Sequence, residues 1–377
     1  MSRLKFKNTA KSAFLPTVRS KVDKYFTDAN ISPNANGKMW FKTLFFLGAF
    51  IGVYTLIISN LFGAWLMLPL AIILGMLSSF VGFNICHDAI HESFSSNKIV
   101  NKTFSLVFNL VGANPYVWSI MHNVVHHTFT NIPGHDEDIE VARGLIRISE
   151  EEPVNRIQRF QHLYAFPLYS MASISWVFRK DYKKFFQSQI GQLKVRHPKI
   201  EYFNLFFFKA VYYFLFIVLP LLILDITWWQ FLIGFIALHI AEGLTMGLVF
   251  QLAHVVEGTN FPTPNTEGNI EDNWAEHQMK TTANFASGNP VAAFFLGGLN
   301  QQIEHHLFPR ICHIHYTKIG QIVKETAHEF NLPYIENPTF FKALKSHYKM
   351  LRKFGMEASL HKPEGKYKTK PQLTAGI

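Results

Sequence analysis

The chain has 377 residues, of which 49% are hydrophobic, 15% aromatic and only 16% charged. A soluble globular domain carries about 25% charged residues, so this composition excludes an ordinary water-soluble globule and also an intrinsically disordered chain. The formal net charge of +10 in so apolar a chain favours an anionic membrane surface, and not nucleic acid, as the partner of the basic residues. Cys86 and Cys312 are the only cysteines, so we expect no disulfide framework and a working face in reducing cytosol.

The first residues are rich in Lys and Arg but lack the short apolar core and cleavage site of a signal peptide. We therefore expect a basic cytosolic arm over residues 1–40, a membrane-embedded body over 41–340 and a basic tail over 341–377.

Four apolar runs in the body approach the roughly 20 residues that a membrane-spanning helix needs. They cover about residues 41–59, 61–86, 203–224 and 228–254. The short joints at residue 60 and at 225–227 contain no Lys or Arg, whereas the segment between the second and third runs and the tail are basic. Because positive charge marks the cytosolic side, both termini and the middle segment are predicted to be cytosolic. The predicted fold is an all-α integral membrane protein with four transmembrane helices in two hairpins and a cytosolic helical cap.

Two shorter apolar stretches, residues 104–121 and 163–178, are interpreted as interfacial or re-entrant. Asn109, Asn114 and Pro115 interrupt the first stretch. If it crossed the membrane, the histidine clusters on either side of it would face opposite compartments.

Three histidine clusters are the most informative feature of the sequence. They are HDAIH at 87–91, HNVVHH at 122–127 and QIEHH at 302–306. A spacing of four residues places two imidazoles on one face of a helix, and all three clusters fall at or beyond the cytosolic ends of the predicted spans. His254 ends the fourth span on the same side. The pattern predicts a shared metal site with nine candidate ligands: His87, His91, His122, His126, His127, His254, Gln302, His305 and His306.

Nine nitrogen-rich ligands exceed the needs of one tetrahedral zinc ion and suit two ions with four or five positions each. Imidazole binds Fe, Zn and Cu, and such a pair with open positions on a membrane indicates O₂ chemistry at iron. Asp88, Glu92 and Glu304 are interpreted as acceptors for the outer N–H groups of the imidazoles, although each could instead be a solvated charge. His277 is a further candidate for that role, or for a place near the substrate head group.

The boxes HDAIH, HNVVHH and QIEHHLFP resemble those of the membrane-bound fatty acid desaturases, over about residues 41–332. Gln302 at the first position of the third box, the stretch His135-Asp-Glu-Asp and the stretch Gly297-Gly-Leu-Asn resemble the front-end branch, of Δ5/Δ6 or linoleoyl-CoA desaturase type. The resemblance implies a di-iron centre held by the box histidines, with His254 as an extra ligand and no catalytic residue apart from the metal site. Whether Gln302 binds iron directly or through water stays open.

The implied reaction uses O₂ and two electrons to introduce a cis double bond into a fatty acyl chain. Eukaryotic front-end members usually carry a fused cytochrome b5 domain with an HPGG motif, and this sequence has no such motif. We therefore expect an external electron donor, ferredoxin or free cytochrome b5, and a bacterial plasma membrane in preference to the endoplasmic reticulum. The position of the double bond, the acyl carrier (CoA, carrier protein or lipid) and the oligomeric state stay open.

Two rival functions are compatible with a histidine-rich membrane protein. A di-iron hydroxylase of an alkane, sterol or carotenoid would use the same ligands. A metal transporter would need ligands near the middle of the bilayer, and here they lie at helix ends and in cytosolic segments.

Overall fold

The computed structural model describes residues 4–7, 12–149, 152 and 155–360. Most of the described residues are helical, and four helices among them are long and apolar enough to cross a membrane. They are α2 (Gly37–Ile58), α3 (Ala64–Val81) continued to Ile90, α11 (Lys199–Tyr213) continued to Ile223, and α13 (Trp228–His254). The prediction of a helical protein with four such helices is confirmed.

The ends of two of these helices differ from the predicted bounds for local reasons. Helix α2 begins at Gly37, earlier than predicted, because the side chain of Asn36 accepts hydrogen bonds from the backbone N–H groups of Lys38 and Met39. Helix α3 begins only at Ala64, and it runs past residue 86 through the π-helical turn η1 (Gly82–Cys86) into α4 (His87–Ile90). The first histidine box therefore continues a membrane-length helix.

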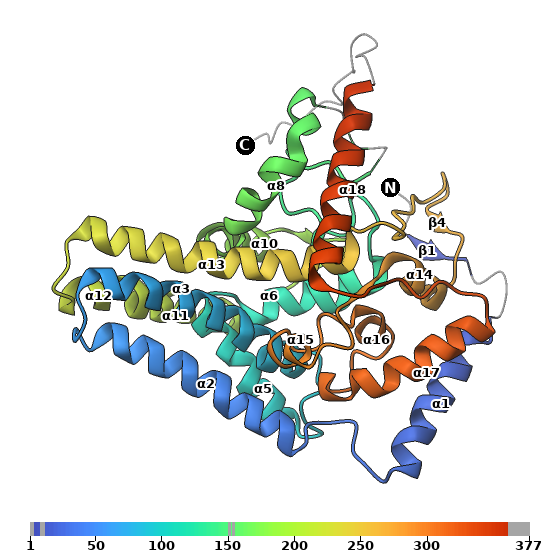
Figure 1. Cartoon of the computed structure of the whole chain (residues 1–377), viewed down its shortest axis with the longest axis horizontal. Helices are drawn as coiled ribbons and strands as arrows, with labels where there is room; N and C mark the ends of the chain where they lie inside the picture. Colours follow the sequence, from blue (N-terminus) through green and yellow to red (C-terminus); the bar gives the residue numbers. More distant parts are fainter. Residues whose placement is uncertain (1–3, 8–11, 150–151, 153–154, 361–377) are drawn as a thin grey trace.

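The joint between α2 and α3 lies beside the joint between α12 (Leu219–Ile223) and α13, at the left of Figure 1. Asn60 donates from Nδ2 to Asp225 Oδ2 over 2.7 Å, and Asp225 N–H donates back to Asn60 Oδ1 over 3.0 Å. Exposed tryptophans gather at this end: Trp65 is 86% exposed and Trp228 71%. Exposed Trp side chains are typical of a membrane–water interface.

Helices α3 and α13 pack closely at the centre of the bundle (Figure 1). A Cβ atom at Gly75 would overlap the carbonyl oxygen of Leu238, so glycine allows this approach. The apolar core here includes Phe46 from α2, Leu74 from α3 and Leu238 from α13. The packing brings the far ends of α3 and α13, which carry the first box and His254, to the same end of the molecule.

Shorter elements surround that end, toward the right of Figure 1. The predicted break between residues 104 and 121 is present: a 3₁₀ turn, η2 (Val107–Val111), ends at Gly112, whose φ is 84°. The helices here are α5 (Lys98–Leu106), α6 (Pro115–Ser119), η3 (Ile120–His126), α7 (His127–Phe129), η4 (Arg156–Phe160), α8 (Gln161–Ser170), α9 (Ala172–Ser175), η5 (Trp176–Lys180), α10 (Asp181–Phe185), α14 (Trp274–Thr281), α15 (Pro290–Phe295), α16 (Gln302–Leu307), η7 (His313–His315) and α17 (Tyr316–Glu329). Among the described residues, the strands form three two-stranded ladders: β1 (Lys5–Phe6) parallel to β4 (Asn269–Ile270), β2 (Gln189–Ile190) antiparallel to β3 (Leu193–Lys194), and β5 (Asn284–Phe285) parallel to β6 (Glu336–Asn337).

Both terminal segments pack on this body. In α1 (Phe14–Asp28), Phe14, Val18, Val22 and Phe26 are buried in a cluster with residues of α17. In α18 (Phe340–Leu360), Leu351 is buried in a cluster with Tyr169 of α8. The predicted basic arm and basic tail are therefore packed elements over these residues, and the part of the tail beyond residue 360 lies outside the described residues.

Candidate metal centre

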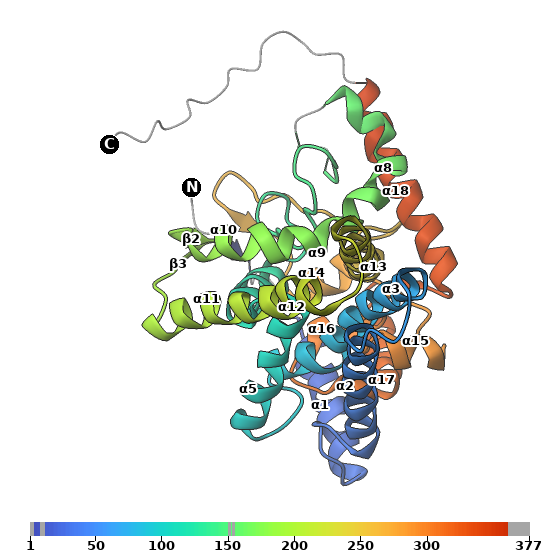
Figure 2. The same ribbon diagram turned by 90° about the vertical axis from the view of Figure 1, so that its left-hand side faces the viewer.

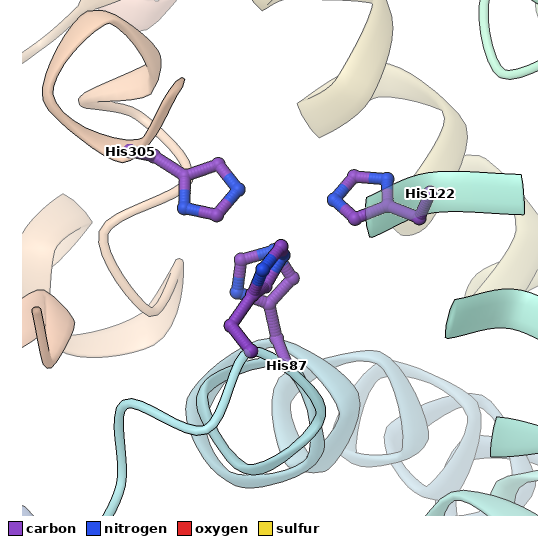
Figure 3. Close-up of side chains that lie close together, drawn as sticks. His87, His122 and His305 are labelled. Atoms are coloured by element: carbon purple, nitrogen blue, oxygen red, sulfur yellow. The ribbon is translucent and has the colours of Figure 1, made fainter. Parts of the chain in front are cut away.

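Eight buried histidines converge from four separate parts of the chain. His87 and His91 come from α4 and its C-terminal end, His122, His126 and His127 from η3 and α7, His254 from the last turn of α13, and His305 and His306 from α16. Candidate ligand atoms of His87, His91, His122 and His305 all lie within 4.8 Å of one another, and those of His126, His254 and His306 form a second such group. Figure 3 shows His87, His122 and His305 directing their rings toward a common point.

His127 lies between the two groups. Its ring centroid is 4.6 Å from that of His305 and 4.4 Å from that of His306. The eight imidazoles are thus arranged as two neighbouring clusters, as a pair of metal ions would require.

The second box divides between the two groups, which its sequence spacing did not predict. His122 and His126 are four residues apart and their rings stack at 5.0 Å, yet they belong to different groups. Residues 120–126 are π-helical, so the two rings lie side by side one turn apart, and each joins the histidines that other elements bring to its own side. The ring of Trp118 stacks on His122 at 4.1 Å and holds its orientation.

The histidine rings present free nitrogen atoms to one another. Among the described residues, no hydrogen-bond partner exists for either ring nitrogen of His87, nor for Nε2 of His91, His254, His305 and His306. A buried polar atom without a partner is costly, so several in one place indicate ligands that a bound cation would satisfy. The donor set therefore fits a metal.

Electrostatics also favours neutral, ligating imidazoles. Burial lowers the pKa of His91, His122, His127, His305 and His306 well below the usual histidine value, and the neighbouring imidazoles lower it further. A neutral imidazole has the lone pair that a metal needs. In His126, burial lowers the pKa, but the charge and hydrogen bond of Asp136 outweigh it, so the net pKa is raised.

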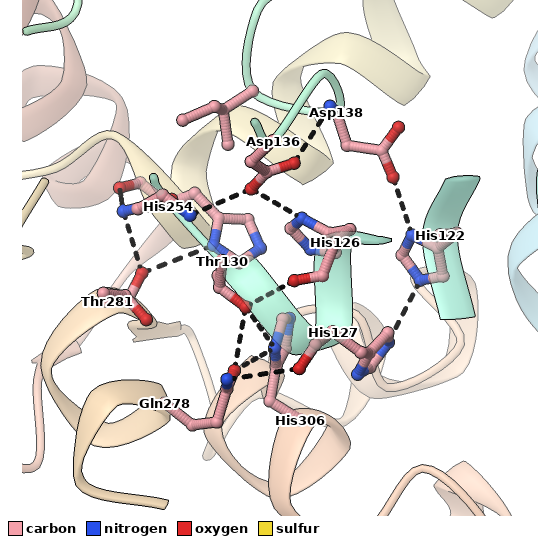
Figure 4. A network of polar contacts seen from close by, with 12 residues as sticks. His122, His126, His127, Thr130, Asp136, Asp138, His254, Gln278, Thr281 and His306 are labelled. Atoms are coloured by element: carbon pink, nitrogen blue, oxygen red, sulfur yellow. Dashed lines mark hydrogen bonds and ion pairs between the residues drawn. The ribbon is translucent and has the colours of Figure 1, made fainter. Parts of the chain in front are cut away.

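Carboxylates from the loop after α7 hold two of the rings (Figure 4). His126 Nδ1 donates to Asp136 Oδ2 over 2.9 Å, and His122 Nδ1 donates to Asp138 Oδ2 over 2.9 Å. Burial acts to raise the pKa of Asp136, but His126 and the Asn131 N–H outweigh it, so this pKa lies below the usual value. These bonds fix each ring with Nε2 directed inward, and an outer partner of this kind also raises the basicity of a ligand.

Neutral partners hold three other rings in the same way. His306 Nδ1 donates to Gln278 Oε1 over 2.7 Å, and His254 Nδ1 donates to the Thr281 carbonyl over 3.4 Å. His305 Nδ1 lies 3.1 Å from the Tyr316 hydroxyl. Each of these rings therefore uses Nδ1 for the protein and leaves Nε2 free.

The carboxylates predicted for this role lie elsewhere. Glu92 is an exposed residue whose carboxylate lies 3.9 Å from Arg310, because positive φ at Glu92 ends the helix and turns the chain outward. Glu304 accepts from Asn284 Nδ2 and the Tyr334 hydroxyl, since it lies on the side of α16 that faces α17 and β5. In the structure, neither carboxylate is bonded to an imidazole of the two groups.

Asp88 and His277 lie farther from the rings of the two histidine groups than predicted. Asp88 Oδ1 lies 4.0 Å from His87 Nδ1, while Asp88 Oδ2 bonds His313 Nδ1 over 2.8 Å and the thiol of Cys312 over 3.0 Å. His313 Nε2 is in turn 2.8 Å from Lys42 Nζ. This series of polar contacts links box one to the loop after box three and to α2. His277 is buried against the Phe6 ring at 5.2 Å and belongs to neither histidine group.

Gln302 lies on α16 one turn before His305 and His306. It is 1% exposed, and neither atom of its amide has a hydrogen-bond partner among the described residues. A buried amide in this state needs a partner, which metal or metal-bound water would supply.

Several residues of the centre were not identified from sequence as partners of the imidazoles: Asp136, Asp138, Gln278 and Tyr316. Asp136 and Asp138 lie ten and sixteen residues beyond their histidines. The one available signal was the acidic stretch after box two, which was noted only for its resemblance to front-end desaturases. Gln278 and Tyr316 carry no distinguishing pattern in the sequence.

The turn that leads into box two is fixed by a buried ion pair. Lys209 Nζ bonds Asp181 Oδ2 and the Gly112 carbonyl, both over 2.8 Å, and Asp181 Oδ2 also accepts from Asn114 N–H. The side chain of Asn114 caps α6. The third transmembrane-length helix thus positions box two from outside the centre.

The chain matches the family model described as fatty acid desaturase over residues 63–338. It is 35% identical over 344 residues to the sn-1 linoleoyl-lipid 6-desaturase of Arthrospira platensis, a match that covers 91% of this chain and 93% of that protein. It is 35% identical over 366 residues to the protein of the same name from Synechocystis sp., covering 94% and 98%. Identity to the acyl-lipid (8-3)-desaturase of Physcomitrium patens is 34% over 355 residues, covering 94% of this chain and 74% of that protein.

Proposed function

The chain belongs to the fatty acid desaturase family, and from this membership we propose that it introduces a cis double bond into the acyl chain of a membrane lipid. The reaction removes two hydrogens from adjacent methylenes, and O₂ is reduced to two waters with two further electrons and two protons. Neither the family match nor these relatives support the hydroxylase alternative. The observation that carries the proposal is the pair of buried imidazole groups with free ring nitrogens.

We propose that both groups hold iron. His87, His91, His122 and His305 would bind one ion, and His126, His254 and His306 the other, with His127 and Gln302 beside them. Bound iron would supply the activation of O₂ needed to oxidise an unactivated methylene. The chain's own task is to orient the imidazoles, through Asp136, Asp138 and Gln278, while burial keeps most of the rings neutral.

The acyl chain would occupy a cavity that reaches His87. This narrow cavity lies between α3, α13 and the segment that leads into box two. Its apolar wall includes Phe108, Trp118, Met246 and Phe250. Such a wall would exclude water and hold one methylene pair beside the histidines, which favours reaction at one position.

The names of the cyanobacterial relatives support a more specific substrate. They describe a linoleoyl chain carried on a lipid and a new double bond at position 6. We therefore propose an acyl-lipid, not acyl-CoA, as the substrate, with the new double bond between the existing ones and the carboxyl group.

We further propose that the histidine-bearing end faces the cytosol of a bacterium and receives electrons from an external donor. The excess of Lys and Arg over acidic residues suits an acidic donor such as ferredoxin or free cytochrome b5, because complementary charge speeds encounter. A C-terminal tag should be accessible to reagents only from the cytosolic side, and accessibility only from outside would contradict this orientation.

The test of the activity is expression in a host of known fatty-acid profile supplied with linoleate, followed by mass spectrometry of the methyl esters. Wild type should yield a triply unsaturated product with the new double bond nearer the carboxyl end. His305→Ala, expressed at the same level, should yield none. Wild-type protein that is inserted in the membrane and contains iron, yet forms no new double bond, would refute the proposal.

A further inference from the structure

The helical segment of η4 and α8, residues 156–170, buries two glutamines on its inner side, next to Ala165 and Tyr169. Its buried side carries Gln158 and Gln161, both 0% exposed. Gln161 Nε2 donates to the carbonyls of Arg147 and Leu351, each over 2.8 Å, and Gln158 Nε2 donates to the Gly144 carbonyl over 3.2 Å. The polar groups that this segment buries are thus satisfied by backbone carbonyls of other segments.

The outward side is apolar. Ile157, Phe160 and Leu163 are 49%, 47% and 60% exposed, and Met171, directly after α8, is 58% exposed. Exposed Pro167 lies between them. Positions 160, 163, 167 and 171 follow a helical period, so they line one face. We call the five exposed residues the outer stripe: Ile157, Phe160, Leu163, Pro167 and Met171.

Water would not favour this arrangement, because Gln is a residue that proteins usually expose and Phe and Leu are residues that they usually bury. In the described part of the chain, all five residues of the outer stripe stay exposed. A contiguous exposed apolar face of this kind marks contact with a membrane or with another protein.

The position at which α8 contacts α13 indicates that the outer stripe meets a membrane and not another protein. A Cβ atom at Gly247 would lie 2.8 Å from Cβ of Tyr169, and one at Gly243 would overlap the carbonyl of Ser170. From Trp228, at 1.5 Å per residue, Gly243 and Gly247 lie about 23 and 29 Å along α13. The hydrocarbon core is about 30 Å thick, so α8 leaves α13 at the level where the core ends, if Trp228 marks the opposite interface.

From this contact α8 runs across the direction of α13 and away from the bundle, as Figures 1 and 2 both show. Its direction therefore lies along the plane of a membrane that the four long helices cross. Arg156 and Arg159 are exposed at its far end, and the Arg159 guanidinium lies over the Phe160 ring at 4.6 Å. Arginines flanking an apolar face suit anionic head groups.

We propose that residues 156–171 form an interfacial helix whose outer stripe inserts into the anionic leaflet on the histidine-bearing side, with Arg156 and Arg159 at the head groups. The interaction needs no acyl substrate in the cavity. It is therefore independent of the desaturase reaction.

The test is lipid quenching of a fluorophore in the full chain, reconstituted in vesicles of phosphatidylcholine and phosphatidylglycerol. Leu163→Cys carries the environment-sensitive label, and Asp23→Cys, on the exposed side of α1, is the matched control. The native Cys86 and Cys312 are both buried, and a labelling reaction on wild type measures their background.

Lipids brominated on the acyl chain should quench the label at position 163 several-fold more than the label at position 23, and aqueous iodide should show the reverse order. Quenching at 163 should increase with the phosphatidylglycerol fraction, and Arg156→Gln/Arg159→Gln should remove that dependence. If bromolipid leaves the label at position 163 unquenched, the proposal is wrong. Quenching by iodide would then show that the outer stripe faces water, and a disulfide between two unlabelled Leu163→Cys chains would show that it faces a second copy of the chain. If quenching at position 163 does not change with the phosphatidylglycerol fraction, Arg156 and Arg159 do not bind anionic head groups as proposed.

Discussion

Asp136 provides the sharpest test of how the protein positions the metal centre. Its carboxylate is buried and accepts three hydrogen bonds: Oδ2 accepts from His126 Nδ1 and Asn131 N–H, both over 2.9 Å, and Oδ1 accepts from Asp138 N–H over 3.0 Å. Asp136→Asn preserves the shape but has only one acceptor oxygen. Whichever way the amide is turned, its NH₂ group faces at least one N–H.

The expected size of the effect follows from these contacts. An unsatisfied buried donor costs about 1–3 kcal/mol, so the variant should be less stable by that amount. If the amide turns its oxygen toward Asp138, His126 loses its acceptor and no longer presents Nε2 in a fixed direction. Loss of such an outer partner typically reduces metal affinity or activity about 10- to 100-fold, which corresponds to about 1.4–2.7 kcal/mol.

The assay compares Asp136→Asn with Glu92→Gln, which alters the exposed carboxylate next to box one. Iron per chain, melting temperature and the unsaturated fraction of cellular fatty acids are measured at matched protein level. Asp136→Asn should lower all three, while Glu92→Gln should match wild type. Full iron content and product yield in Asp136→Asn, or an equal loss in Glu92→Gln, would refute the assignment.

Three other outcomes are expected. Purified wild type should hold close to two irons per chain, and His126→Ala should lose iron and activity together, as measured by elemental analysis and methyl-ester profile; one zinc per chain would contradict the di-iron proposal. Gln302→Ala should lose most turnover while inserting normally and Gln302→His should keep part of it, whereas wild-type yield from the Ala variant would remove Gln302 from the site. Burial lowers the pKa of His347 to about 4, so the folded state binds fewer protons than the unfolded state between pH 6.5 and 4 and loses about 3 kcal/mol as pH falls through that window. The melting temperature of His347→Gln should therefore fall less than that of wild type between pH 7 and pH 5, and parallel curves would refute the argument.

The sequence alone was sufficient for the four membrane-length helices, because a long apolar run without charge has few other stable states. It also identified the eight histidines that converge. HxxxH and HxxxHH place imidazoles on one side of a local helix, and the charge distribution placed the boxes at one end of the bundle. These features depend on local periodicity and composition, which a sequence states directly.

The division of the histidines into two groups depended on the tertiary structure. His122 and His126 stack side by side, but His122 meets His87, His91 and His305 whereas His126 meets His254 and His306, and nothing in HNVVHH indicates these partners. The residues that bond the outer nitrogens of the imidazoles also depended on the tertiary structure. Glu92 is next to its histidine in sequence but turns away at a positive φ, whereas Asp136 returns to His126 through a loop.

The structure also decided which side of residues 156–171 faces outward. Gln158 and Gln161 are buried because backbone carbonyls of residues 144, 147 and 351 need donors there, and α18 supplies one of those carbonyls from about 190 positions along the chain. Local sequence sets the period of a helix and the chemistry of its faces. Which face becomes the interior is set by the packing of distant segments, because each buried polar group must find its partner in three dimensions.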